Sequence, residues 1–529
     1  MNLLLTSAPM FDVCSGIFEQ EINSCQAGLA PCNSIYLLAS IIRSDHQIDL
    51  LDPANNDFEF NGKKRIRVLD IEKEPSVRFP ALENCLKNKD VVCISATSFN
   101  WFLAKLMVKR IKELDPDLPI IAGGIHPTLA DRHILESTNV DYIVRGEGEK
   151  TLPELLRSLE NGAPLTGVDG ISYIENGRII RNKDRQLLMA GELDSNPLPA
   201  LDLLPSNIYS KVCVETSRGC RFNCTFCTLA SLGAWRSSSP QASLKRIEHA
   251  IEYAGKLRAG RRELSIVDGN FSDDRKRSEK ILEGLKEMDL CNFGIDFESR
   301  VNDLIGSRIL DLGRDLPLDF ILVGIECGYE SGQRKIRKGI DLKMIEKCAT
   351  MAKEKEIAIY YSFILGFPWE TKEECLKTVA FADKLISKYN GVAIMNWFQQ
   401  FPGSRLWDER KSFGLDDGLE LFDTLRMFQK DYRLKMSPNL TEKDFKDIVA
   451  DLYKYNMMQL LTDCKADSSE SVKHVNDAIH PSHSLPPGHI IFMDFADDMA
   501  YLRNIGRIQR EIGPQEQLIL PRCEKFSAS

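Results

Sequence analysis

Three cysteines within one short run, Cys220, Cys224 and Cys227, constrain this 529-residue chain more than any other feature. They follow an apolar, strand-like stretch at 212–215, so they are expected on the loop at the carboxyl end of a strand, where barrel active sites form. Cluster irons prefer thiolate sulfur, and three cysteines at spacings of four and three would leave one iron of a [4Fe–4S] cube open. The alternative is a zinc knuckle or simple core packing, but a zinc site usually needs a fourth Cys or His nearby, and residues 228–248 contain none. The run therefore predicts a [4Fe–4S] cluster.

Composition narrows the class of protein. The chain is long enough for two or three domains, and 43% hydrophobic with 27% charged residues is typical of a soluble globular protein. A net charge of -9 gives no basic footprint for nucleic acid. No apolar run approaches a membrane span, and residues 2–5 favour a first strand over a signal peptide. We expect a cytoplasmic protein with reduced thiols.

The first 160 residues alternate short β-branched runs with amphipathic helical patterns. Strand-like runs occur at 3–6, 47–51, 67–70, 91–95, 119–124 and 142–144. This alternation predicts a doubly wound α/β domain with a parallel sheet, which binds ligands at the carboxyl ends of its strands. Residues 161–205 then read as a hairpin around Asn176-Gly177 followed by a linker.

A second alternating region spans 206–405. Its six strand-like runs are 212–215, 264–268, 293–297, 320–325, 358–363 and 392–397. Six strand–helix repeats predict a partial (β/α)6 barrel. Residues 406–529 are expected to be a helical C-terminal region, with a flexible linker at 465–489 and a helix near 499–510.

The cysteine run is similar to the motif of the radical S-adenosylmethionine (SAM) superfamily, and the barrel pattern follows the order of that family. The resemblance implies that residues at the ends of later strands contact SAM. These residues are Asp268, Ser299, Arg300, Glu326 and Leu365. The last belongs to a stretch resembling the family's G-x-I-x-G-x-P motif near adenine, although Ser362 replaces its first glycine. For each residue the alternative is turn chemistry at the end of a strand.

The first domain resembles the cobalamin-binding domain that precedes the barrel in a large radical SAM class. The segments that carry the resemblance, together with a polar strand end, would border cobalamin: Ser95, Thr97, Gly123, Gly124, Gly146, Glu147, Gly148 and Glu149. The alternative is that the glycines serve only the turns. The chain lacks the D-x-H-x-x-G motif that supplies a lower cobalt ligand in many such domains. His126 is either a replacement ligand or a histidine satisfied at a turn.

The resemblance implies a cobalamin-dependent radical SAM methyltransferase acting on an unactivated carbon of a small-molecule or peptide substrate. It also implies an external electron donor such as flavodoxin or ferredoxin. Two alternatives stay open: a cyclase or oxidative rearrangement enzyme without methyl transfer, and a first domain that binds a substrate or partner instead of cobalamin. A second cluster at Cys14, Cys25 and Cys32 matches no compact motif, and the histidines at 474, 480, 483 and 489 favour a solvated linker over a metal site.

Overall fold

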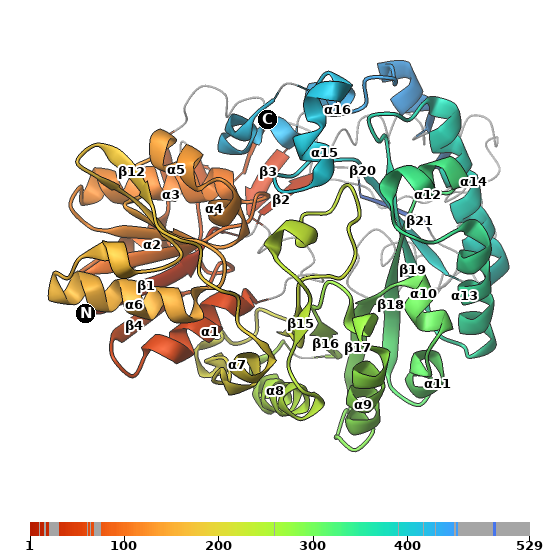
Figure 1. Cartoon of the computed structure of the whole chain (residues 1–529), viewed down its shortest axis with the longest axis horizontal. Helices are drawn as coiled ribbons and strands as arrows, with labels where there is room; N and C mark the ends of the chain where they lie inside the picture. Colours follow the sequence, from red (N-terminus) through yellow and green to blue (C-terminus); the bar gives the residue numbers. More distant parts are fainter. Residues whose placement is uncertain are drawn as a thin grey trace.

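The computed structural model joins two α/β halves, the N-terminal one at the left of Figure 1 and the barrel at the right. It describes residues 1–60 except 10, 15–16 and 21–30, then 62–63, 65–67, 76–452 except 259, 390, 416, 429 and 449–450, and finally 490–493. Within these residues, no helix is both long and apolar enough to cross a bilayer.

The N-terminal half is built on five parallel strands. In spatial order these are β4 (Gln47–Leu51), β1 (Asn2–Ser7), β8 (Val91–Ser95), β9 (Ile120–Gly123) and β10 (Tyr142–Val144). If these five strands are numbered by their order in the chain, their spatial order is 2-1-3-4-5. The direction in which the chain adds strands reverses between β1 and β8, and such a reversal opens a ligand crevice at the carboxyl ends of the strands. The prediction of a doubly wound sheet is confirmed.

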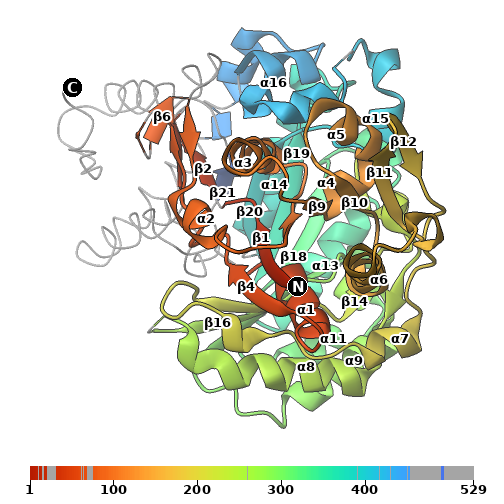
Figure 2. The same ribbon diagram turned by 90° about the vertical axis from the view of Figure 1, so that its left-hand side faces the viewer.

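Alternation along these strands explains why helices cover both faces. Leu3 and Leu5 pack in the core under α1 (Asn33–Ile42) and α6 (Gly148–Asn161). Leu4 lies in the opposite core, under α3 (Trp101–Leu114). Successive side chains of a strand point to opposite faces of the sheet. An uninterrupted apolar run therefore places apolar side chains in the cores on both faces. Figure 2 shows α3 and the α1–α6 pair on opposite sides of the row of strands.

The hairpin predicted after this domain extends its sheet. Strands β11 (Ile171–Glu175) and β12 (Arg178–Arg181) add antiparallel to the edge at β10. Asn176 and Gly177 have φ of 51° and 73°, as the tight hairpin turn requires. Of the strand predicted at 67–70 only Arg67 is described, and 68–70 lie outside the described residues. Arg67 ends β6 (Arg65–Arg67), which pairs with β3 (Ile17–Gln20) in a separate antiparallel sheet with β2 (Phe11–Cys14).

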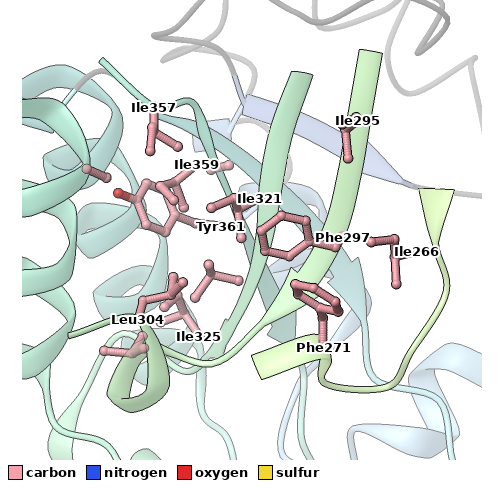
Figure 3. Packing of buried hydrophobic residues seen from close by; sticks show 14 of the residues in the cluster. Ile266, Phe271, Ile295, Phe297, Leu304, Ile321, Ile325, Ile357, Ile359 and Tyr361 are labelled. Atoms are coloured by element: carbon pink, nitrogen blue, oxygen red, sulfur yellow. The ribbon is translucent and has the colours of Figure 1, made fainter. Parts of the chain in front are cut away.

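Each of the six predicted barrel strands is present, and neighbours pair in parallel. They are β13 (Lys211–Val214), β16 (Arg262–Ile266), β17 (Phe293–Ser299), β18 (Leu318–Glu326), β19 (Ile359–Leu365) and β20 (Val392–Trp397). A seventh strand, β21 (Ile490–Met493), pairs in parallel with β20 and was not predicted. The strand side chains that face away from the barrel interior pack against the outer helices and form the main core, part of which Figure 3 shows.

Helices connect the barrel strands on the outside. They include α8 (Pro240–Glu252), α9 (Arg275–Leu285), α10 (Val301–Ile305), α11 (Ile309–Gly313), α12 (Glu330–Ile336), α13 (Leu342–Glu354) and α14 (Lys372–Tyr389).

The C-terminal segment lies over both halves (Figure 1). It runs through short elements, including α15 (Arg405–Asp408), the 3-10 helix η9 (Leu419–Asp423) and α16 (Lys430–Met436). Asp423 accepts hydrogen bonds from Trp101 and from His133, each at 3.0 Å, which fastens the segment to the N-terminal half. The predicted linker at 465–489, its histidines and the helix near 499–510 lie outside the described residues.

Candidate functional site: two adjoining cavities

The three cysteines of the run all line one cavity of about 430 Å³ at the carboxyl ends of the barrel strands. The run begins in a two-stranded hairpin, in which β14 (Ser217–Arg218) pairs with β15 (Arg236–Ser237). Gly219 turns the chain away from β14 with φ of 72°. A Cβ at Gly219 would lie 2.6 Å from the carbonyl oxygen of Gly233, so glycine lets the two sides of the loop close.

This arrangement fits a cluster better than a single metal ion. Within the part of the chain that the structure describes, no three His, Cys, Asp or Glu side chains converge closely enough to hold one ion. A zinc ion needs four ligands around one point, whereas the thiolates of an iron–sulfur cube each bind a different iron. Three cysteines spread around one cavity could therefore hold a cube whose fourth iron faces the other lining residues.

Three predicted SAM-contacting residues line the same cavity: Ser299, Arg300 and Glu326. Arg300 is 6% exposed, and its Nη1 lies 3.5 Å from Sγ of Cys224. Its guanidinium lies 3.6 Å from the ring centre of Phe222, and its Nη2 donates to the carbonyl of Lys338. Arg300 thus places a fixed positive charge beside the cluster cysteines.

Sequence reasoning missed Lys338, whose Nζ donates to Glu326 at 2.6 Å inside this cavity. Glu326 sits at a break in strand register with φ of 68°. Gly324 makes room for the pair, because a Cβ there would lie 2.3 Å from Oε1 of Glu326 and 2.5 Å from Nζ of Lys338. Lys338 follows a helix and belongs to no motif, so nothing in the sequence marked it. The cavity presents both charges, which suits a ligand that carries an amino and a carboxylate group.

Glu298 is a second lining residue that the predictions left out. Its side chain is exposed to solvent, yet the neighbouring protein raises its pKa above the ordinary 4.5 by desolvation, against the opposing effect of Lys338.

Two predicted SAM contacts, Asp268 and Leu365, line neither cavity and stay predictions. Asp268 is 1% exposed and lines neither cavity; its carboxylate accepts four hydrogen bonds, from the backbone N–H and the hydroxyl of both Thr216 and Ser217. The turn-forming alternative describes it better. Leu365 points into the main core, while Ser362 and Ile364 line the cavity. Alternate residues of a strand face opposite ways, so the side chain of Leu365 lies on the face opposite to the cavity.

The loop after β19 depends on a buried carboxyl. Glu370 is 0% exposed and accepts hydrogen bonds from Gly366 N at 2.7 Å, Phe367 N at 3.0 Å and Tyr329 Oη at 2.9 Å. Burial raises its pKa to about 7 despite these bonds. The carboxyl therefore holds the loop at the edge of the cluster cavity.

Glu370 gives a pH prediction. Its pKa is higher in the folded state than the ordinary 4.5, so the folded chain binds an extra proton between pH 4.5 and 7, and stability falls as pH rises through that window. The difference corresponds to about 3 kcal/mol. We expect the melting temperature of the wild type, relative to Glu370→Gln, to drop between pH 5 and 8. A constant difference between the two proteins would contradict this assignment.

A second cavity, of about 840 Å³, lies between the sheet of the N-terminal half and the barrel. Seven predicted cobalamin-bordering residues line it: Ser95, Thr97, Gly124, Gly146, Glu147, Gly148 and Glu149. Gly124 has φ of 99°, and a Cβ there would lie 2.5 Å from the carbonyl oxygen of Ala96. The glycine lets two strand ends approach each other and keeps the crevice open to a large ligand. The cavity has the size and position expected of a cofactor site.

Two residues of the cobalamin prediction lie elsewhere. Gly123 ends β9 next to the cavity without lining it. His126 is 0% exposed and lies between Trp101 and Phe422, with Nδ1 3.0 Å from Oγ of Ser98. Burial lowers its pKa to about 3. It is a neutral core histidine hydrogen-bonded to a hydroxyl, so the interpretation as a cobalt ligand is not supported. The alternative, a histidine satisfied at a turn, did not predict that its partner is the side chain of Ser98.

Glu147 joins the two halves. Its carboxylate accepts hydrogen bonds from Arg218 at 2.9 Å, Arg236 at 2.7 Å and the backbone N–H of Leu188 at 2.6 Å. Arg218 also pairs with Glu149 at 2.6 Å. The two arginines stand opposite each other on the β14–β15 hairpin. The turn at the crevice is thereby tied to the loop of the three cysteines, a connection that the sequence did not reveal.

The two cavities adjoin. Leu229 and Gly269 line both of them. Leu229 lies two residues after Cys227, and a Cβ on Gly269 would meet its side chain at 2.4 Å. A ligand in the interdomain cavity and one in the cluster cavity would be separated at this point by little more than one leucine side chain.

Two family models match the chain: the radical SAM superfamily over residues 214–382 and the B12-binding domain over residues 63–156. The "Uncharacterized methyltransferase PH0819" of Pyrococcus horikoshii is 30% identical over 400 residues, covering 74% of this chain and 80% of that protein. The anaerobic magnesium-protoporphyrin IX monomethyl ester cyclase of Synechocystis sp. is 26% identical over 263 residues, covering 49% of this chain and 52% of that protein.

A solved structure of OxsB, described as a cobalamin-dependent SAM radical enzyme with aqua-cobalamin and SAM bound, is similar in fold. Its TM-score is 0.59 at 16% identity, and the match covers 97% of this chain and 80% of that chain. The radical SAM match implies a [4Fe–4S] cluster and SAM as cofactors, and the B12-binding match implies cobalamin in the first domain. Both domains in this order, the fold and the Pyrococcus relative together show that the chain belongs to the cobalamin-dependent radical SAM enzymes.

Proposed function

We propose that this protein methylates an unactivated carbon of a small-molecule or peptide substrate. The observation that carries the proposal is the junction of the two cavities at Leu229 and Gly269, because methyl transfer needs cobalamin and the SAM-binding cluster within reach of one substrate. The Pyrococcus relative, whose name describes a methyltransferase, supports the same reaction class.

In this proposal Cys220, Cys224 and Cys227 bind three irons of the cluster. When bound, the cluster would supply an electron that cleaves SAM into methionine and a 5′-deoxyadenosyl radical, and cobalamin would carry the methyl group. The chain's own work is to hold these groups in line and exclude water. Arg300 beside Cys224 and the Glu326–Lys338 pair would hold the charged end of SAM.

The N-terminal half would hold cobalamin against the crevice. Thr97, Gly124 and the segment 146–149 line the interdomain cavity from the strand ends. The eleven cysteines whose side chains the structure describes are free, which fits the reducing cytoplasm proposed for this protein.

Metal analysis tests the cofactor assignment. We expect the chain reconstituted anaerobically with iron, sulfide and hydroxocobalamin to hold about four irons and one cobalt. A variant with Cys220, Cys224 and Cys227 all changed to Ala should lose the iron and keep the cobalt. Cys348→Ala, a buried cysteine on α13, is the control and should keep both. Retention of full iron by the triple variant would refute the assignment of the ligands.

A cyclase is the second candidate, because the Synechocystis relative bears that name. Products distinguish the two reactions. Methyl donation converts SAM into S-adenosylhomocysteine, whereas hydrogen abstraction alone gives 5′-deoxyadenosine. We expect the reduced, cobalamin-loaded protein to form both S-adenosylhomocysteine and 5′-deoxyadenosine from SAM. Formation of 5′-deoxyadenosine without S-adenosylhomocysteine would favour the cyclase.

A further inference from the structure

The loop of the three cysteines reaches the surface beside a group of exposed cations. Within the loop, Arg221 and Asn223 are exposed. Behind it, the segment after β18 packs against the loop through its backbone: Thr225 N donates to the carbonyl of Ile336 at 3.0 Å. The residues on either side of Ile336 are therefore adjacent to the position proposed for the cluster.

Those flanking residues are basic. Arg334, Lys335 and Arg337 are all exposed, whereas Ile336 and Lys338 are buried. Together with Arg221 they form what we call the basic rim. Within the described residues, Arg334, Lys335 and Arg337 have no carboxylate partner, in a chain whose net charge is -9. Arg221 pairs with Asp273 at 3.7 Å and lies over the ring of Trp235.

Local stabilisation accounts for part of this charge only. Arg334 and Lys335 lie in the last turn of α12, where cations interact favourably with the helix end. Lys335 also lies 5.3 Å from the ring centre of Trp369. Arg337 follows the helix in the left-handed region, with φ of 55°, and points to no acid that the structure describes. The fold therefore exposes positive charge beside the cluster cavity, and the local contacts of these residues do not account for all of that charge.

We propose that the basic rim is the docking surface for an acidic one-electron carrier protein that reduces the cluster. The inference rests on the proposed function, since radical SAM chemistry needs one electron from an external reductant. One electron passes from the carrier to the cluster, so the carrier is oxidised by one electron and no atom is transferred. Opposite charge raises the rate of encounter between proteins and orients them.

Reduction kinetics test the proposal. The cluster-loaded protein is mixed anaerobically with a reduced flavodoxin, an acidic carrier, and the cluster is followed by its visible absorbance. We expect Arg334→Glu, Lys335→Glu and Arg337→Glu together to slow reduction by about tenfold or more at low salt. The wild-type rate should fall as salt rises, while the variant loses that dependence. Reduction by dithionite should stay within about twofold, because a small reductant needs no docking surface.

A matched triple reversal controls for net charge. Lys109, Lys245 and Lys280 are exposed on α3, α8 and α9, which lie at the left and at the bottom of Figure 1, away from α12. Changing these three to Glu alters the net charge equally and should leave the flavodoxin rate near that of the wild type. Arg337→Glu alone, outside the helix, gives a smaller decrease in the same direction if the triple variant folds poorly.

Equal slowing by both triple variants would overturn the proposal, because only net charge would then matter. A basic-rim variant reduced by flavodoxin at the wild-type rate would also overturn it. Failure of the proposed function is seen separately: a wild-type chain that takes up no iron overturns both, and this is measured before any reduction begins.

Discussion

Gly219→Ala is expected to abolish most of the cluster uptake while leaving the barrel folded. Gly219 precedes Cys220, and its φ of 72° costs an alanine about 1–2 kcal/mol. The added Cβ would also lie 2.6 Å from the carbonyl oxygen of Gly233 and 2.7 Å from that of Ala234. Both contacts are to backbone, so relief requires opening the loop that positions the cysteines. Iron and sulfide per chain after anaerobic reconstitution measure the effect.

Gly177→Ala is the matched control for this change. Gly177 has nearly the same φ, 73°, but an added Cβ would meet nothing within 4 Å. It shares the backbone cost without the contacts, and it lies in the hairpin turn far along the chain from the cysteines. We expect a small loss of melting temperature and full iron content. If both alanine variants bind iron equally, the close approach at Gly219 does not shape the cluster loop.

Local sequence patterns predicted the positions of the strands better than they predicted which strands pair. The apolar strands of both sheets were predicted because parallel strands buried on both faces are uninterrupted apolar runs. The strand β21 was missed because its partner β20 lies a long stretch of chain away. The pairing of β6 with β3 was not predicted because a short run does not reveal which sheet it joins. Pairing between distant segments is a tertiary property that single-sequence patterns do not carry.

The site shows the same division. The cysteine run and the polar residues at the ends of β17 and β18 converge on one cavity because the ends of parallel strands meet at one edge. The side chain of Leu365 lies on the core face of β19, which strand alternation relative to Ser362 and Ile364 could have predicted. Lys338, which follows a helix, and Arg236, on the second strand of the cysteine hairpin, could not be found in this way. They reach the site through contacts with Glu326 and Glu147, which no residue spacing in the sequence predicts.

Glu147→Ala is expected to weaken both cofactor sites together. The carboxylate binds Arg218 and Arg236, and the side chain of Arg236 is 8% exposed. Removing one partner from a buried ion pair leaves an uncompensated charge and typically costs about 3–5 kcal/mol. Arg218 keeps Glu149 and Glu215, but Arg236 has no other carboxylate among the described residues. The hairpin that leads to Cys220 would then lose its anchor on the crevice turn.

The measurements are the free energy of unfolding, the affinity for hydroxocobalamin and the iron content of Glu147→Ala, beside Glu147→Gln and a surface control. Glu373→Ala removes an exposed helix pair, 79% exposed at the glutamate, and should cost less than about 0.5 kcal/mol. Glutamine keeps an oxygen that accepts from Arg236 but not the negative charge. The three measured values for Glu147→Gln should therefore lie between those of the wild type and those of Glu147→Ala. Two cofactor sites held by one carboxylate must weaken together. An alanine variant that loses cobalamin affinity with full iron content would show that Glu147 serves the crevice alone, and the reverse pattern would show that it serves only the cysteine loop.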